Sequence, residues 1–328
     1  MTIDLSSNQK FQLIHEMTER DNNVLSISTL CEIACVSRSG YYAWLNSAKT
    51  REKKNEQDKE DFVYVLEAYS SYGYSKGARG IYMYLLHKHP ERIMNIKKIR
   101  RLMKKFNLNC PIRKANPYRR MAKALKTNNV VSNIVNREFE GHGPRSILLT
   151  DITYIPLNGK YCYLSVIIDA YTKQVLSYVL SPSLELDFVL ETVNNLISNH
   201  KDSLKTDVLL HSDQGSHYTS IKFAQLLKDK NIRQSMSRRG NCWDNAPQES
   251  FFGHMKDEIN LSNIHSFDDA KRLIDDWMYY YNNYRYVWNL AYLSPNEYYE
   301  YVCSGVYPLS IDIPIRFIPK GFALKPRV

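Results

Sequence analysis

The sequence lacks the features of disulfide-stabilised, secreted and membrane proteins. Its six cysteines are scattered over 328 residues, and only Cys31 and Cys35 stand close together, without the second Cys or His pair of a zinc site. No apolar run approaches the roughly 20 residues that span a bilayer. The N-terminus lacks the basic and apolar regions of a signal peptide. These absences predict a cytoplasmic protein with reduced, mostly buried thiols and no membrane partner.

Acidic residues are nearly missing from one stretch of the chain. The whole sequence has 44 basic and 34 acidic residues, a net charge of +10. Between Lys88 and Lys126 there are fourteen Lys or Arg residues and a single acid, Glu91, so this stretch alone carries +13. A charge that serves solubility would be interspersed with acids, whereas a concentrated charge is typical of a phosphate-binding surface. The sequence therefore predicts a polyanionic partner.

Residues 1–50 predict a small helical unit. Apolar spacing indicates helices at residues 8–20, 28–34 and 37–45, with a tight turn between the last two. This is the pattern of a helix-turn-helix, which would place Arg38 at the start of the helix that enters a DNA groove. A helical bundle without DNA contact is an equally good interpretation. The residues expected inside are Ile27, Leu30, Ile33 and Val36.

Residues 51–112 predict a second helical DNA-binding unit. Its last helix has the sequence IKKIRRLMKKFNL and follows Asn95, a favourable capping residue. Apolar side chains share one face of this helix, and the opposite face is basic, with Lys97, Lys98, Arg100, Arg101, Lys104 and Lys105. A recognition helix is favoured over a merely solvated face, because the chain stays basic after it. Residues 113–145 contain Pro and Gly and predict a basic linker.

Residues 146–265 predict a catalytic core of the α/β class. Three runs rich in β-branched and aromatic residues, the first two joined by Asn158-Gly159, predict three antiparallel strands. Helices then alternate with two short strands. This order is that of an RNase H-like core, a mixed five-stranded sheet with flanking helices, preceded by the all-α helix-turn-helix units. Residues 266–328 predict a C-terminal helical extension and tail, with helix starts at SFDD and SPNE.

Three acids stand out because of their places in this core. Asp151 lies within the apolar first strand, Asp213 follows the fourth strand, and Glu249 lies within a later helix. An ionised carboxylate in a central strand is costly to desolvate unless it is paired or bound to metal. Carboxylates gathered at strand ends would repel one another without a cation, and Mg²⁺ favours such oxygen ligands. The sequence therefore predicts a metal-binding Asp-Asp-Glu triad suited to displacement at phosphorus.

Other polar residues near these acids are weaker candidates for a part in the active site. Asp169 ends the second strand and is a minor candidate for the same pocket, whereas Asp244 is better explained as a helix N-cap. His211 and His217 flank Asp213, and we expect them to position other groups rather than to bind metal.

Two further groups of residues have candidate roles at DNA. Arg238 and Arg239 precede a loop, residues 240–247, that is a candidate DNA contact. An aromatic helix near residue 280 either closes the catalytic domain, which is the favoured interpretation, or clamps nucleic acid. Its residues are Tyr280, Tyr281, Tyr284 and Arg285.

Several long motifs resemble one known family. They are LLTDITYIP, LLHSDQGSHYTS, SMSRRGNCWDNAPQESFFGHMKDEI and YYNNYRYVWNLAYLSPNEYY. These runs resemble the OrfB-type DDE transposases of bacterial insertion sequences, whose core is shared with retroviral integrases. The family has thirty-five residues between its second and third acids, the number found here between Asp213 and Glu249. Lys256, two helical turns after Glu249, matches the family's basic residue at the DNA end.

The resemblance implies a function and several partners. It implies a transposase that uses two Mg²⁺ ions, replaceable by Mn²⁺, to cleave DNA at transposon ends and to join the freed 3′-hydroxyl to another phosphodiester. The expected partners are double-stranded DNA of the terminal inverted repeats and the target, a second copy of the chain on DNA, and an upstream frameshift-fusion partner. The expected place is the bacterial nucleoid. Two alternatives are another RNase H-like nuclease, which shares the acids, and a non-catalytic DNA-binding regulator.

Overall fold

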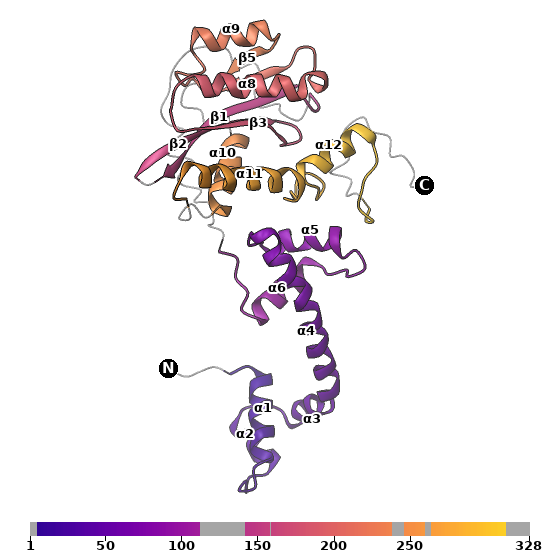
Figure 1. The fold of residues 1–328 in the computed structure, drawn as a ribbon. Helices are drawn as coiled ribbons and strands as arrows, with labels where there is room; N and C mark the ends of the chain where they lie inside the picture. Colours follow the sequence, from indigo (N-terminus) through magenta and orange to yellow (C-terminus); the bar gives the residue numbers. More distant parts are fainter. Residues whose placement is uncertain (1–4, 112–141, 158, 238–245, 260–263, 313–328) are drawn as a thin grey trace. The chain divides into compact units, whose positions relative to one another are not determined.

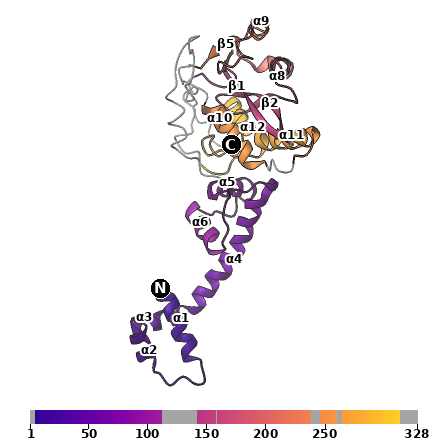
Figure 2. The same cartoon turned by 90° about the vertical axis from the view of Figure 1, so that its left-hand side faces the viewer.

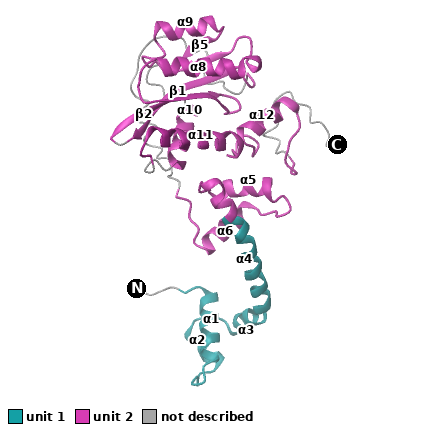
Figure 3. Ribbon diagram, viewed as in Figure 1, with its two compact units in different colours: residues 1–66 teal, residues 67–328 magenta. Residues whose placement is uncertain are grey.

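The computed structural model describes residues 5–111, 142–157, 159–237, 246–259 and 264–312. The chain divides into two compact units, residues 1–66 and 67–328 (Figure 3). Within the described ranges, no helix is both long and apolar enough to cross a membrane. The predicted linker, residues 113–145, lies mostly outside these ranges.

The first unit is the predicted bundle of short helices. Serines cap its helices, which are α1 (Ser7–Thr18), α2 (Ile27–Ile33) and α3 (Arg38–Asn46). The buried residues of its core are Ile14, Leu30, Cys31 and Tyr41. Ile33, which the spacing predicts inside, is 68% exposed, because the turn that begins at Cys35 (φ +52°) ends the helix just after it. Cys31 takes the inner position instead. Helix α4 (Ala48–Ser70) spans the boundary between the units.

The second unit begins with the helices that carry the basic stretch. A short turn, η1 (Ser71–Gly73), leads to α5 (Ala78–Lys88) and α6 (Ile96–Lys105). Asn95 caps α6 as predicted, since its Oδ1 accepts a 2.8 Å hydrogen bond from the N–H of Lys98. The apolar face of α6 is buried and consists of Ile99, Leu102 and Met103.

A five-stranded sheet follows, in the order β3-β2-β1-β4-β5. Strands β1, β2 and β3 pair antiparallel, and β4 runs parallel to both β1 and β5. The strands are β1 (Ile147–Leu157), β2 (Lys160–Asp169), β3 (Val175–Ser181), β4 (Leu209–Ser212) and β5 (Arg233–Met236). This mixed sheet confirms the predicted RNase H-like core.

Helices cover both faces of the sheet (Figures 1 and 2). One face packs against α8 (Asp187–His200) and α9 (Ile221–Asp229), and the other packs against α10 (Ala246–Glu258) and α11 (Phe267–Asn283). The remaining helical elements are η2 (Lys201–Ser203) and α12 (Pro295–Ser304). Helix α12 begins at the predicted SPNE start, with Pro295 in its first turn. It has a capping box, in which the side chains of Ser294 and Glu297 each accept a hydrogen bond from the other residue's backbone N–H. The alternation of apolar side chains along β1 therefore divides the core into two layers.

The described cysteines are all free thiols, but their burial differs from the prediction. Cys31 and Cys162 are buried, Cys110 is partly buried, and Cys35 and Cys303 are exposed. The two exposed thiols lie in a turn and at the end of a helix, where no apolar layer covers them.

Candidate active site

The parallel pair of β1 and β4 places two of the predicted acids next to each other. Leu149 of β1 lies beside His211 of β4. Asp151 and Asp213 each stand two residues further along, which is one full period of a strand. Continued by two residues, the register therefore makes Asp151 and Asp213 neighbours at the end of β4.

A buried tyrosine lies within electrostatic range of both acids. Tyr218 is 2% exposed, and its hydroxyl lies 3.5 Å from Oγ1 of Thr150. Burial raises the pKa of Tyr218 well above its ordinary value, and the carboxylates of Asp151 and Asp213 raise it further by opposing a phenolate. Both charges act on the same hydroxyl, which agrees with the register of β1 and β4.

Backbone amides hold both carboxylates in place. Oδ1 of Asp151 accepts a 2.8 Å hydrogen bond from the N–H of Ile152, and Oδ1 of Asp213 accepts one of 2.8 Å from the N–H of Gly215. A Cβ atom at Gly215 would stand only 2.9 Å from that same oxygen. A side chain at position 215 would therefore displace this carboxylate. Asp151 is partly buried and Asp213 is exposed, so both are open to solvent.

Helix α10 carries the third predicted acid. Its buried side is apolar and consists of Phe251, Phe252 and Met255. In its first turn, Nε2 of the fully buried Gln248 donates a long, 3.4 Å hydrogen bond to the carbonyl oxygen of Val166, the partner of Asp151 across β1 and β2. Glu249 is the next residue and is exposed. This turn of α10 is thereby held beside the row of the sheet that contains Asp151.

Lys256 lies two turns further along α10. It is exposed, but the protein around it lowers its pKa through partial desolvation, and the nearby carboxylate of Asp151 opposes that shift. Helix α10 packs against β1, and Lys256 lies within electrostatic range of Asp151. One region of the structure therefore contains Asp151, Asp213 and Lys256.

Glu249 does not join the two aspartates in a compact group. Among the residues that the structure describes, no three His, Cys, Asp or Glu side chains are close enough together to hold one metal ion. Asp151 and Asp213 thus form a pair, with Glu249 on the adjoining helix. Asp244, the predicted N-cap of this helix, lies outside the described residues.

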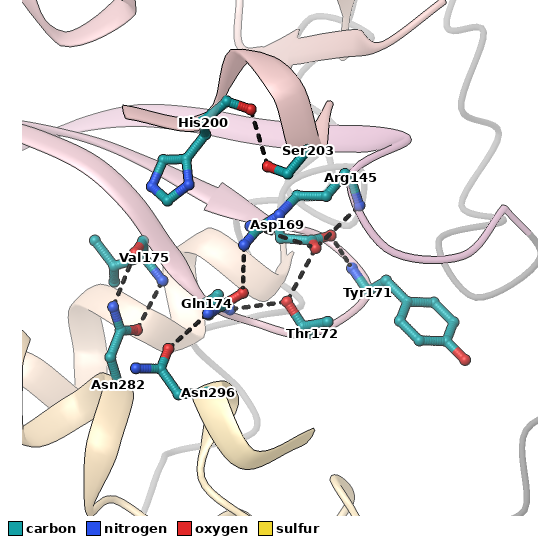
Figure 4. Close-up of polar contacts among 10 residues, drawn as sticks. All are labelled: Arg145, Asp169, Tyr171, Thr172, Gln174, Val175, His200, Ser203, Asn282 and Asn296. Carbon is teal, nitrogen blue, oxygen red and sulfur yellow. Dashed lines mark hydrogen bonds and ion pairs between the residues drawn. The ribbon is translucent and has the colours of Figure 1, made fainter. Parts of the chain in front are cut away.

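Asp169, the minor candidate for the pocket, is enclosed by hydrogen-bond donors instead. It is 0% exposed. Its carboxylate accepts hydrogen bonds from the N–H of Arg145 (3.1 Å), the N–H of Tyr171 (2.9 Å) and the hydroxyl of Thr172 (2.9 Å). The guanidinium of Arg145 lies 3.8 Å away and is also buried (Figure 4). The role of Asp169 is therefore to hold the turn between β2 and β3.

The same network reaches the C-terminal helices (Figure 4). Oε1 of Gln174 accepts a 2.7 Å hydrogen bond from Arg145, and its Nε2 donates one of 2.6 Å to Oδ1 of Asn296 on α12. Asn282 of α11 bonds both the N–H and the carbonyl oxygen of Val175, at 2.9 and 2.8 Å. The C-terminal extension is thus joined to the end of the sheet by partly buried hydrogen bonds.

The sequence is similar to known proteins both in the core and over most of its length. Two family models described as integrase core domains match residues 141–242 and 230–295. The putative transposase InsK for insertion sequence element IS150 of Escherichia coli (strain K12) is 31% identical over 275 residues, 83% of this chain and 93% of that protein. The chain belongs to the integrase-core family of insertion-sequence transposases. As a member of this family, the transposase acts in DNA transposition.

A second transposase agrees with this membership. Transposase InsF for insertion sequence IS3A of Escherichia coli (strain K12) is 30% identical over 244 residues, 73% of this chain and 81% of that protein. Among solved structures, the HTLV-2 integrase catalytic core domain in complex with magnesium is 16% identical, with a TM-score of 0.38 over 48% of this chain and 97% of that chain.

The two histidines beside Asp213 have protein partners in the transposase. His211 is fully buried, and its Nδ1 lies 3.0 Å from Oγ of Ser235. Nε2 of His217 lies 2.8 Å from the carbonyl oxygen of Leu184. These contacts agree with positioning roles.

The aromatic helix α11 closes the transposase core, which is the favoured interpretation of the sequence. Tyr280 and Tyr281 are buried with Trp277 against the sheet. Nε and Nη2 of Arg285 both donate hydrogen bonds to Oε1 of Glu258, at 3.0 and 2.9 Å.

The predicted DNA contacts remain at the surface. On α6 the side chains of Lys97, Arg100, Arg101 and Lys104 are exposed and that of Lys98 is partly exposed, while Arg38 is exposed in the first turn of α3. Arg238 and Arg239 lie outside the described residues. Sequence patterns alone do not indicate Tyr218, Gln248 or Arg145, because their roles depend on strands that are far apart in the chain.

Proposed function

We propose that the transposase cuts and joins DNA at Asp151, Asp213 and Glu249, with bound Mg²⁺. The observation that carries this proposal is the parallel register of β1 and β4, which, continued by two residues, sets Asp151 within β1 beside Asp213 just after β4. Two neighbouring ionised carboxylates repel each other, and a divalent cation removes the repulsion. Carboxylate oxygens are the ligands that Mg²⁺ prefers, and Mn²⁺ would substitute.

The carboxylate chemistry of these residues suits two such ions, and Glu249 would have to approach the two aspartates to complete the set. Asp151 and Asp213 would share them, and Glu249 would complete the second site from the first turn of α10. Bound there, the ions would supply Lewis acidity at the scissile phosphate and at the attacking oxygen. The backbone N–H groups of Ile152 and Gly215 fix one oxygen of each aspartate, which supports a preorganised donor set.

The reaction consists of two displacements at phosphorus. In the first, water attacks the phosphodiester at the transposon 3′ end, its proton passes to solvent, and the broken P–O bond leaves a free 3′-hydroxyl. In the second, that hydroxyl attacks another phosphodiester, so one P–O bond forms as one breaks. The ammonium of Lys256, on the side of α10 that is close to Asp151, would pair with a phosphate of the DNA end.

DNA binding would come from the basic surfaces outside the core. The exposed face of α6 and Arg38 would contact the terminal inverted repeats, and Arg238 and Arg239 are proposed as further DNA contacts. Two transposon ends must be held together, so we infer at least a dimer on DNA. Fusion to an upstream partner is a further proposal, which the flanking reading frame tests directly.

A strand-transfer assay with an end-mimicking duplex tests the catalytic assignment. We expect Asp151→Asn, Asp213→Asn and Glu249→Gln each to reduce cleavage and joining by about 10³-fold or more, while the affinity for end DNA changes little. The matched control is Asp229→Asn, an exposed acid at the end of α9, which is expected to keep full activity. Unimpaired cleavage by the Asp151 or Glu249 variant would overturn the assignment.

The same assay separates the two alternatives. A wild-type protein that cleaves any duplex, whatever its end sequence, would be an RNase H-like nuclease. A protein that binds end DNA but neither cleaves nor joins it with Mg²⁺ or Mn²⁺ would be a regulator.

A further inference from the structure

A strained turn presses two aromatic rings against the C-terminal helices. Tyr72 (φ +61°) and Gly73 (φ +74°) are both in the left-handed region, which is unfavourable for a bulky aromatic residue unless its surroundings hold it there. The ring of Tyr72 stacks on that of Tyr284, with centroids 4.6 Å apart and planes at 17°. The ring of Tyr74 lies 4.4 Å from that of Tyr280. These contacts hold the turn in its strained form.

Lys76 is buried at the same contact. It is 9% exposed, and its Nζ donates hydrogen bonds to the carbonyl oxygens of Ser71 and Tyr74, at 2.5 and 3.0 Å. The ammonium also lies 5.7 Å from the centroid of the Tyr280 ring. Burial lowers the pKa of Lys76 to about 8, against the opposing effect of the Glu258 carboxylate. The buried ammonium of Lys76 thus connects the turn at residues 71–74 to Tyr280 of α11.

Glu258 connects this contact to the helix that carries Glu249. It is the last residue of α10. Its Oε1 accepts hydrogen bonds from Nε and Nη2 of Arg285, and its Oε2 accepts one of 3.0 Å from the indole of Trp277. Both members of the ion pair are largely buried. The end of α10 is therefore fixed where the strained turn meets α11.

Helix α5 also packs against the C-terminal segment, at residues 286–302. Met83 shares a buried cluster with Tyr292, Leu293 and Tyr301. The ring of His87 stacks on that of Tyr286 at 3.6 Å. Helix α5 in turn packs against α6. An unbroken series of packed side chains therefore runs from the basic helix α6 to the helix that carries Glu249.

We propose that residues 71–88 form a brace that fixes α6 relative to Glu249, so that the transposase cleaves at a set distance from the DNA sequence that α6 contacts. This inference rests on the proposed function. Tyr72, Tyr74 and Lys76 are positioning residues, which act through Tyr280 and Glu258 rather than on the DNA itself. Because base pairs are stacked 3.4 Å apart along the duplex, a looser connection would spread cleavage over neighbouring phosphates.

End duplexes with altered spacing test the brace in the wild-type protein. One or two base pairs are inserted between the α6 footprint and the scissile phosphate, and the cleavage position is mapped on a sequencing gel. We expect the cut to stay at its original distance from the footprint and so to move by the inserted number. Cleavage that remains at the original phosphate would overturn the proposal.

A pair of variants tests the positioning residues. Tyr74→Ala removes the ring that contacts Tyr280, and its matched control, Tyr74→Phe, keeps it. We expect cleavage at neighbouring phosphates to rise at least about threefold in the alanine variant and to stay at the wild-type level in the phenylalanine variant, with the same α6 footprint for both. Equal accuracy in the two variants would contradict the proposal. Tyr72→Ala serves in the same comparison if Tyr74→Ala does not fold.

Photo-crosslinking gives a readout that needs no cleavage. A photoreactive amino acid in place of Gly253, exposed on α10 with open space around it, marks the base pairs that α10 faces. We expect its crosslinks to keep a fixed offset from the α6 footprint in the wild-type background and to spread in Tyr74→Ala. A fixed offset in a protein with no cleavage would count against the proposed function alone, whereas a variable offset with normal cleavage would count against the brace alone.

Discussion

The substitution Asp169→Asn distinguishes a structural carboxylate from a catalytic one. Asp169 is fully buried, as is Arg145 beside it. Its Oδ1 accepts the N–H of Tyr171, and its Oδ2 accepts the N–H of Arg145 and the hydroxyl of Thr172. An asparagine amide nitrogen only donates, so it would be placed at Oδ1, where one hydrogen bond is lost rather than two.

The expected cost follows from these contacts. One hydrogen bond to a charged group contributes about 1.5–3 kcal/mol. The guanidinium of Arg145 also loses its carboxylate partner, and breaking a buried ion pair costs about 3–5 kcal/mol. Because these two effects overlap, we expect the free energy of unfolding of residues 67–328 to fall by about 3–5 kcal/mol. For a unit of this size, the melting temperature should fall by roughly 10 °C.

Thermal and urea unfolding, followed by circular dichroism, measure this change beside the strand-transfer assay. At a temperature where Asp169→Asn is still folded, we expect it to cleave within a few-fold of the wild type. Asp151→Asn should show the opposite pattern, a near-normal melting temperature with cleavage lost. An Asp169→Asn variant that is as stable as the wild type but inactive would refute the structural assignment and return Asp169 to the active site.

Three further predictions concern single contacts. Gly215→Ala places a methyl group 2.9 Å from Oδ1 of Asp213, and we expect at least a tenfold loss of cleavage with little change in melting temperature; unchanged kinetics would show that this carboxylate has no catalytic part. Replacing Lys97, Arg100 and Lys104 together by Ala should weaken binding to all duplexes. The negative slope of log K against log salt, measured by fluorescence anisotropy, should become shallower by about 2.7. An unchanged slope would show that the DNA binds elsewhere. The pKa of Lys76 is about 8 in the folded protein against 10.5 ordinarily, so between these pH values the unfolded chain binds more protons than the folded one. The free energy of unfolding of the wild type should therefore rise with pH relative to that of Lys76→Met, by up to about 3 kcal/mol in urea unfolding at pH 7 and pH 10. A difference between the two proteins that does not depend on pH would contradict the burial of the Lys76 charge.

Much of the fold follows from local sequence signals. The alternation around Asp151 and the cap at Asn95 are patterns of neighbouring residues, and the elements they predict are present in the structure. Ile33 is an exception, because apolar spacing alone does not reveal where the turn at Cys35 ends a helix.

Local sequence signals predict only part of the candidate site. Strand order predicts that Asp151 and Asp213 are neighbours, but no periodicity indicates the buried Tyr218 close to Thr150. The burial of Asp169 depends on Arg145, which is 24 residues away in the chain. The same holds for Lys76 and Tyr280, whose cation–π contact joins segments that look independent in the sequence. Long-range polar contacts of this kind depend on tertiary packing, so a local pattern does not predict them.

The hydrogen bond between Gln174 and Asn296 has a consequence for synthesis of the protein on the ribosome. It joins residues 122 positions apart, and the bonds of Asn282 to Val175 join residues 107 apart. Contacts of such separation form only after the intervening chain has emerged, and they slow folding. A nascent chain that already contains Asp151, Asp213 and Glu249 still lacks the helices that complete its core. The three acids are therefore made early, but the domain that holds them is finished only when α12 leaves the ribosome.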